Sequence, residues 1–145
     1  MEINKHFEAL ENMYLAAPIN SIYKPTISIS EGFSEINMNV SEIYHHGAGA
    51  VHGSIYFKML DDAAFFAASS YELKFFIVTT SFTTYLTKPV SKGKLKSTGK
   101  VVNKNKSQFI VESIVYDSED REIGRGNGIF VRSKMLLTQA NGYEA

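Results

Sequence analysis

The sequence predicts a single α+β domain, residues 1–145, in which a curved antiparallel sheet wraps around one long central helix. Residues 53–70 form a helical segment that is apolar on almost every side, and a helix of that kind is buried. An alternating hairpin precedes it, and four runs rich in β-branched and aromatic residues follow it. These strands are the segments available to cover the helix, so they must close around it.

The first element is a short amphipathic helix within residues 1–18. Apolar residues recur at helical spacing from Ile3 to Tyr14, and Pro18 closes the segment. We expect this helix to cover an edge or a face of the main body.

A β-hairpin is predicted next. Residues 24–30 and 33–40 each alternate between polar and apolar, with Glu31 and Gly32 at the turn. A polar, glycine-containing loop over residues 41–51 then leads into the central helix.

Four further strands are predicted to follow the helix as an antiparallel meander. They cover residues 75–86, 94–102, 107–116 and 122–132. Gly124, Gly126 and Gly128 recur at period two in the last run, which predicts a flat strip that the central helix or a neighbouring subunit approaches. Residues 134–145 are expected to form a loose tail.

Composition excludes several classes of function. Lysine plus arginine and aspartate plus glutamate both number 15, so no overall charge favours nucleic acid or an anionic membrane. The chain has no cysteine, which excludes disulfides, thiolate metal sites and a cysteine nucleophile. The N-terminus has no signal-peptide pattern and no segment is apolar enough to span a bilayer, so a cytoplasmic location is expected.

The candidate catalytic residues lie at the start and in the middle of the central helix. Asp61 is a carboxylate in apolar surroundings, which is costly unless it is paired or used. Asp62 points about 100° away from it, and Lys58 can pair with either aspartate. Gly53 begins the helix, where free N–H groups and the helix dipole stabilise developing negative charge. The alternative is that both aspartates lie at the surface and that Gly53 only fits the entry turn.

The loop and helix resemble a known motif. His52, Gly53 and Ser54, with Gly49 before them and Asp61 nine residues after His52, are similar to the motif of acyl-CoA thioesterases of the phenylacetate-pathway type, which have the hotdog fold. The run TSFTTYLTKPVSKGKL also resembles that family, and the likeness covers residues 20–133. Three positions depart from the family pattern: His46 replaces Asn or Gln, Ser54 replaces a second glycine, and Phe65 replaces Ser or Thr.

The resemblance implies hydrolysis of an acyl-CoA thioester. Gly53 would polarise the carbonyl. Asp61 of the neighbouring subunit would either activate a water molecule or attack the carbonyl directly, and its short side chain favours the water route. His52 would orient the loop, touch the substrate or start the helix, and His46 would position the substrate or stay exposed in the loop. The further residues expected to contact the substrate or coenzyme A are Ser54, Phe65, Phe82, Lys104 and Lys106.

The same resemblance implies a homodimer or homotetramer with its active sites at the subunit interface. No metal is expected, because the histidines at 45, 46 and 52 lack a metal-binding spacing, and no cofactor is expected besides coenzyme A as part of the substrate. Two alternatives are a non-catalytic acyl-CoA binding or sensing protein and a dehydratase acting on acyl-carrier-protein substrates. The chain lacks the Pro- and Phe-rich loop typical of such dehydratases.

Overall fold

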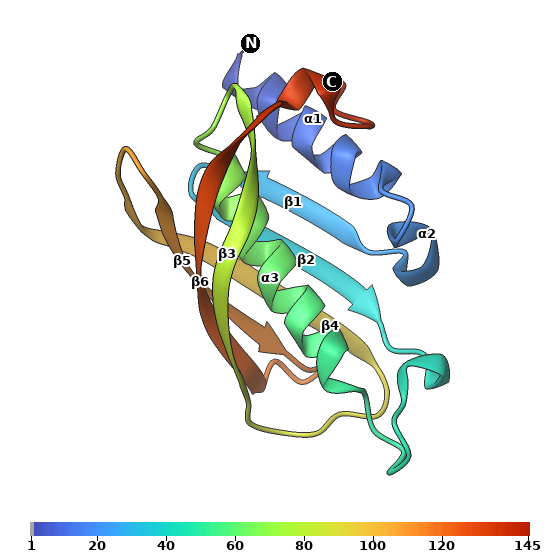
Figure 1. The fold of residues 1–145 in the computed structure, drawn as a ribbon. Helices are drawn as coiled ribbons and strands as arrows, with labels where there is room; N and C mark the ends of the chain where they lie inside the picture. The colour runs from blue at the N-terminus through green and yellow to red at the C-terminus, as the bar shows by residue number, and fades with distance from the viewer. Residues whose placement is uncertain (1) are drawn as a thin grey trace.

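The computed structural model describes residues 2–145 and confirms an α+β architecture in which one sheet curves around α3 (Figure 1). Its helices are α1 (Ile3–Ala16), α2 (Asn20–Tyr23) and α3 (Gly53–Ser69), with two short 3-10 turns, η1 (Glu42–Tyr44) and η2 (Leu137–Gln139). Its strands are β1 (Thr26–Ser30), β2 (Phe33–Asn39), β3 (Phe75–Leu86), β4 (Lys94–Lys104), β5 (Phe109–Tyr116) and β6 (Glu122–Leu136). The one-turn helix α2 was not predicted from the sequence.

The strand order is β1-β2-β4-β5-β6-β3, with every neighbouring pair antiparallel. The predicted four-strand meander is therefore wrong for β3, which pairs with β6 and not with β4. The connection over residues 87–93 is too long for a tight hairpin, and it is bonded to the start of α3. Val51 N–H donates to the Val90 carbonyl at 2.8 Å, and the Tyr56 hydroxyl donates to the Lys88 carbonyl at 2.7 Å. These bonds draw the chain across the helix start, so β4 begins beside β2.

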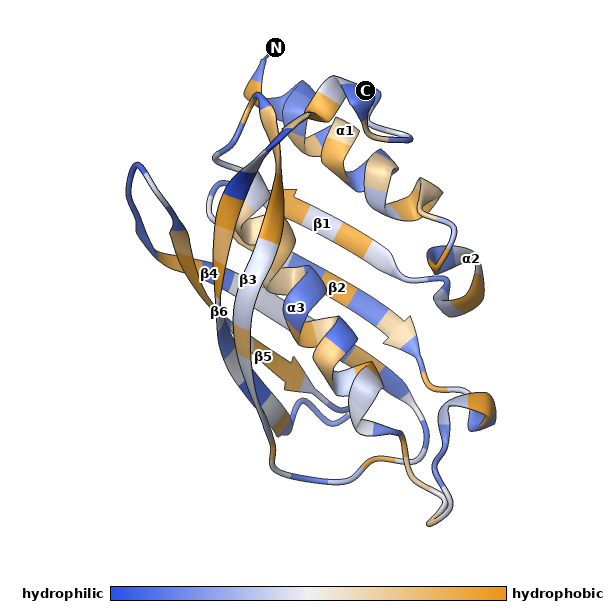
Figure 2. Ribbon diagram, in the orientation of Figure 1, coloured by the Kyte–Doolittle hydropathy of each residue, from blue (hydrophilic) through white to orange (hydrophobic). Residues whose placement is uncertain are grey.

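Small residues on the sheet let α3 lie close to it. The Ser34 and Ser97 hydroxyls donate to the carbonyls of Ala63 at 2.6 Å and Met59 at 2.8 Å. A Cβ on Gly99 would collide with the Ala63 carbonyl. Figure 2 shows α3 as a largely apolar ribbon interrupted by a hydrophilic stretch, and that stretch holds the candidate site.

The C-terminal segment is ordered, so the predicted loose tail is wrong. Leu137 and Tyr143 are buried in an apolar cluster that includes residues of α1. A 2.6 Å hydrogen bond joins the Tyr143 hydroxyl to His6 Nδ1, and His6 Nε2 lies 2.8 Å from the Ser69 carbonyl. The tail is fixed by residues more than a hundred positions away, which its local sequence does not reveal.

The glycine strip on β6 lies against β3, which was not predicted, and at one position near α3, which was; its approach by a neighbouring subunit stays a prediction. A Cβ on Gly126 or Gly128 would meet the Phe82 ring, so β3 is the element that approaches these two positions. Only Gly124 also lies near α3, where a Cβ would be 3.4 Å from the Tyr56 ring. The strip therefore leaves room over β6 for the large Phe82 side chain of β3.

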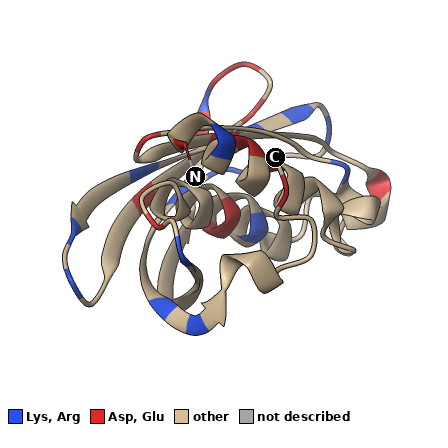
Figure 3. Cartoon of the chain, turned by 90° about the horizontal axis from the view of Figure 1, so that it is seen from above, with Lys and Arg blue, Asp and Glu red and all other residues tan. Residues whose placement is uncertain are grey.

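Acidic and basic residues are interspersed over the face shown in Figure 3, in keeping with the balanced composition. Within residues 2–145, no helix is both long enough and apolar enough to cross a bilayer.

Candidate active site

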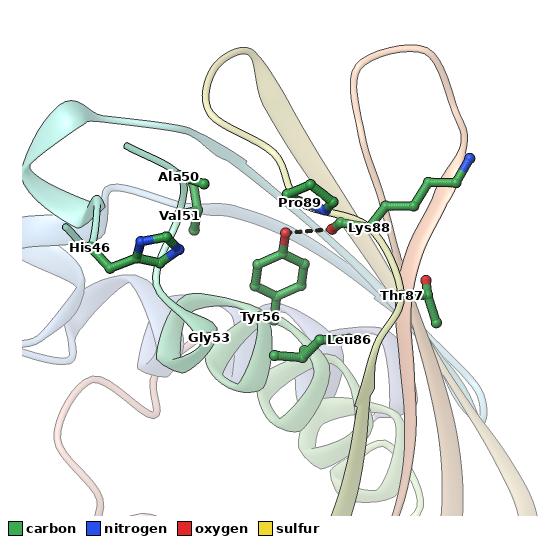
Figure 4. Close-up of a pocket in the computed structure, with 9 residues that line it drawn as sticks. All are labelled: His46, Ala50, Val51, Gly53, Tyr56, Leu86, Thr87, Lys88 and Pro89. Atoms are coloured by element: carbon green, nitrogen blue, oxygen red, sulfur yellow. Dashed lines mark hydrogen bonds between the residues drawn. The ribbon is translucent and has the colours of Figure 1, made fainter. Parts of the chain in front are cut away.

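Two cavities open beside α3, one at its start and one at its middle. The first has a volume of about 250 Å³ and is lined by Gly53, His46 and the loop that ends β3 (Figure 4). The second, of about 330 Å³, is lined by Asp61 and by residues of α1, α3 and β3. The two predicted catalytic elements thus lie in different cavities of one chain.

The cavity at the helix start presents a backbone donor. His52 is the N-cap of α3: its Nδ1 accepts the Ser54 N–H at 3.1 Å and its carbonyl accepts the Ile55 N–H at 3.0 Å. The Gly53 N–H is left as the first-turn donor at the cavity, reinforced by the helix dipole. Of the three roles proposed for His52, the structure shows the helix-starting one.

His46 and Ser54 flank this helix start. His46 is exposed and lines the first cavity, where its Nδ1 accepts the Ala48 N–H at 3.0 Å. Ser54 is exposed and its hydroxyl lies 2.8 Å from His52 Nδ1. Both are therefore bonded within the loop and helix cap, and their proposed contacts with a substrate stay predictions.

Asp61 projects into the second cavity, and no ion pair among residues 2–145 includes it. It is half-buried, and its Oδ1 accepts a hydrogen bond from the Thr79 hydroxyl at 2.9 Å. Burial raises the pKa of the Asp61 carboxyl to about 6, although the Thr79 bond favours the charged form. A carboxylate with this pKa ionises near neutral pH while remaining a better base than an ordinary aspartate.

Asp62, the adjacent carboxylate, lines the same cavity but is bonded to other groups. Its Oδ2 lies 2.7 Å from Lys58 Nζ and accepts the Tyr14 hydroxyl at 2.8 Å. Burial and the neighbouring Asp62 raise the pKa of Tyr14 far above its usual value, so Tyr14 is a neutral donor. The two aspartates thus have different surroundings, and only Asp61 is left available.

Thr79 was not identified from the sequence. A hydroxyl facing the carboxylate is a natural partner for it, but β3 also carries Thr80, Thr83 and Thr84. Choosing among them requires the position of β3 relative to α3, which depends on the pairing with β6.

The remaining predicted substrate residues do not all gather at Asp61. Phe65 does: it lines the same cavity and packs on Phe66 and Phe76, with ring centroids 4.9 Å and 5.4 Å away. Phe82 lines neither cavity and packs edge-to-face on Phe57 at 5.6 Å.

Lys104 and Lys106 lie at the β4–β5 turn, in a separate open depression that includes Arg132. Lys104 Nζ is 3.8 Å from the centre of the Tyr71 ring. Among residues 2–145, no group of three or more His, Asp or Glu side chains is placed to hold a metal ion.

Comparison with known proteins gives the family. The family model described as Thioesterase superfamily matches residues 48–123, which include the helix start, Asp61 and Thr79. No curated protein matches the sequence.

Solved structures of similar fold come from several bacteria. The PaaI protein of the Escherichia coli phenylacetic acid degradation operon matches with a TM-score of 0.83 at 20% identity, over 92% of this chain and 96% of that one. A thioesterase from Haemophilus influenzae matches with a TM-score of 0.75 at 19% identity, over 86% and 88%. A thioesterase family protein from Silicibacter pomeroyi matches with a TM-score of 0.77 at 18% identity, over 86% and 95%.

At these identities the structural matches establish the fold, and they confirm the hotdog fold that the sequence motif implied. The family-model match covers more than half of the chain. This chain belongs to the Thioesterase superfamily.

Proposed function

We propose that this protein hydrolyses an acyl-CoA thioester to the free acid and coenzyme A. The observation that carries the proposal is Asp61, a half-buried carboxylate that faces a cavity. Within residues 2–145 it forms no ion pair, and its pKa is raised to about 6. Such a group is suited to take a proton from an attacking water molecule near neutral pH. Membership of the Thioesterase superfamily supports the choice of reaction.

In the proposed reaction, the thioester carbonyl accepts a hydrogen bond from the Gly53 N–H. Water attacks the carbonyl carbon while the Asp61 carboxylate removes its proton, and the negative charge on the carbonyl oxygen is stabilised at the helix start. The carbonyl then re-forms, the carbon–sulfur bond breaks, and the departing thiolate takes up a proton. Thr79 holds the carboxylate in place throughout. Asp61 has a short side chain, which favours this water route over direct attack.

One chain cannot supply both groups to the same carbonyl. Gly53 and Asp61 are eight residues apart on one helix, a rise of about 12 Å. We therefore infer that the site is shared, with Gly53 from one copy facing Asp61 from another. The position of β3 at the end of the sheet supports this inference, because its outer edge is unpaired in the single chain and can receive a second copy. Val78 of β3 and Phe57 of α3 are exposed by 39% and 42% and add apolar surface there.

A panel of short, long and aromatic acyl-CoA substrates, followed by release of free thiol, tests the proposal. Hydrolysis of at least one substrate is the expected result. Binding of acyl-CoA without hydrolysis would instead favour the non-catalytic binding protein, since His46 and Phe65 replace groups that the family usually carries.

Replacing both Lys104 and Lys106 with alanine should weaken substrate binding and leave the maximal rate unchanged. We expect this result because the two lysines are proposed to contact the phosphates of coenzyme A.

The shared site can be tested with Gly53→Pro. Proline at the first helical position fits a helix start and removes the N–H, and its Cβ meets only the end of the flexible Leu86 side chain at 3.1 Å. We therefore expect a loss of about 10²–10³-fold in rate. Co-refolding this variant with Asp61→Asn should restore about a quarter of wild-type activity, because half of the resulting dimers carry one intact site. Gly53→Ala keeps the donor and is the matched control. No recovery in verified mixed dimers would contradict a shared site.

Replacing Thr79 with valine should move the pH dependence of hydrolysis. The Thr79 hydroxyl stabilises the charged carboxylate, so its loss raises the pKa of Asp61 further. The acid limb of the rate profile should then shift to higher pH, as measured by kcat/KM between pH 4.5 and 8.5. Thr79→Ser keeps the hydroxyl and should leave the limb in place. An unchanged limb in the valine variant would show that Thr79 does not set the ionisation of Asp61.

A further inference from the structure

A half-buried ion pair lies on α3 immediately beside Asp61. Lys58 Nζ is 2.7 Å from Asp62 Oδ2, and the two side chains are only 13% and 20% exposed. Lys58 and Asp62 line the same cavity as Asp61. The proposed reaction uses neither of them, so their position at the site calls for an explanation.

Lys58 has two carboxylates within its reach and is bonded to one. Asp61 and Asp62 follow it by three and four residues, and both spacings allow an ion pair on a helix. Two tyrosines favour the pairing with Asp62. The Tyr14 hydroxyl donates to the same Asp62 oxygen at 2.8 Å, and Lys58 Nζ lies 5.4 Å and 5.1 Å from the ring centres of Tyr14 and Tyr23. Elements outside α3 therefore hold the ammonium group on the Asp62 side.

The groups around Asp61 can be named by element. Tyr14 comes from α1 and Thr79 from β3, while Lys58 and Asp62 belong to α3 itself. Tyr23 of α2 contacts this group only through Lys58 Nζ. Of these groups, only Thr79 forms a hydrogen bond with Asp61. None of the ion pairs within residues 2–145 joins a cation to Asp61. Burial raises the pKa of Asp61, the Asp62 charge raises it further, and the Lys58 charge lowers it. A cation bonded directly to Asp61 would hold it ionised and make it a weaker base.

We propose that Asp62 is a positioning residue that binds Lys58 and so keeps this cation off the Asp61 carboxylate. Tyr14 is the second member of the arrangement, since it orients the Asp62 oxygen that receives Lys58. The proposal rests on the proposed function only in taking Asp61 as the reacting group. It concerns an equilibrium of the resting protein, so it can be measured without turnover.

The two partners of the pair should give opposite results. In Asp62→Asn, one negative charge is lost and Lys58 is released to bond Asp61, so the titration midpoint of Asp61 should fall by about one pH unit. In Lys58→Met, the stem length is kept but the cation is lost beside two carboxylates, so the midpoint should rise by a similar amount. The double variant removes both charges and should return the midpoint close to the wild-type value.

The measurement is carboxyl carbon-13 NMR titration of the full chain, with the Asp61 signal assigned from its absence in Asp61→Asn. The acid limb of kcat/KM is recorded in parallel on the best substrate of the acyl-CoA panel. Lys96→Met and Asp120→Asn are the matched controls, because Lys96 and Asp120 form a similar 3.1 Å pair at an exposed position away from the site. They should leave the Asp61 midpoint unchanged.

Shifts of opposite sign that cancel in the double variant would support the positioning role. Shifts of the same sign, or midpoints unchanged in both single variants, would overturn it and leave the pair with a structural role. A failure of the proposed function gives a different result: no acyl-CoA is hydrolysed, while the NMR midpoints still report whether Asp62 keeps Lys58 from Asp61.

Discussion

Replacing Asp61 with asparagine is expected to lower the rate of thioester hydrolysis by about 10³-fold, because the amide cannot accept a proton from water. The amide keeps the size of the side chain and can still accept the Thr79 hydrogen bond, so the fold should be unaffected. Thiol release from the best acyl-CoA substrate measures the effect. Asp120→Asn, at an exposed turn, is the control and should keep full activity. Retained hydrolysis in Asp61→Asn would exclude both proposed routes through this carboxylate.

The same variant has an expected signature in stability. The folded-state pKa of Asp61 is raised to about 6 from 3.8, so the folded state loses stability relative to the unfolded chain as pH rises through this range. Asp61→Asn should therefore be more stable than wild type at pH 8, by about 1–2 kcal/mol after allowance for partial exposure. The difference should vanish below about pH 3, where aspartate is protonated in both states. Urea unfolding at the two pH values measures it, and a gain that is independent of pH would contradict the assigned cause.

Gly99→Ala is expected to cost about 3 kcal/mol of unfolding free energy. A Cβ at this position would collide with the Ala63 carbonyl and lie 2.8 Å from the Ala64 nitrogen, both in the rigid backbone of α3. The helix cannot yield without weakening its bonds to Ser34 and Ser97. Chemical denaturation measures the loss, and activity should fall as well, because Asp61 lies on the displaced turn.

Gly47→Ala is the matched control for this substitution. Gly47 lies in the exposed loop before α3, where no atom lies within 4 Å of an added Cβ. Its stability should match wild type to within about 0.5 kcal/mol. If the two variants were equally stable, the close approach of α3 to the sheet would not be what excludes a side chain at position 99.

Local patterns in the sequence were enough to predict most of the elements. The nearly uniform apolar character of α3 required a covering sheet, and the alternation in β1 and β2 placed the hairpin almost to the residue. The spacing from His52 to Asp61 predicted the family, which the family-model match confirms. It also predicted two candidate site residues, because helix geometry fixes both positions on one element.

The failures share a physical cause, which is contact between residues distant in the sequence. β3 was placed beside β4 because the two are consecutive, yet the glycines of β6 are what accept its Phe82 ring. Thr79 could not be chosen among the threonines of β3 without that pairing. Residues 134–145 look polar and loose by composition, but Leu137 and Tyr143 are buried in an apolar cluster that includes residues of α1.

The N-terminal helix and the C-terminal segment are bonded to each other, which has a practical consequence for how the protein is handled. Asn12 Nδ2 donates to the Glu144 carbonyl at 2.6 Å, and both termini lie at the opposite end of α3 from Gly53 (Figure 1). Affinity tags or fusion partners at either terminus would project from that one pole, away from the loop that carries His46. The same proximity makes the domain suited to circular permutation, with a short peptide joining the old ends and new termini opened at the exposed β4–β5 turn.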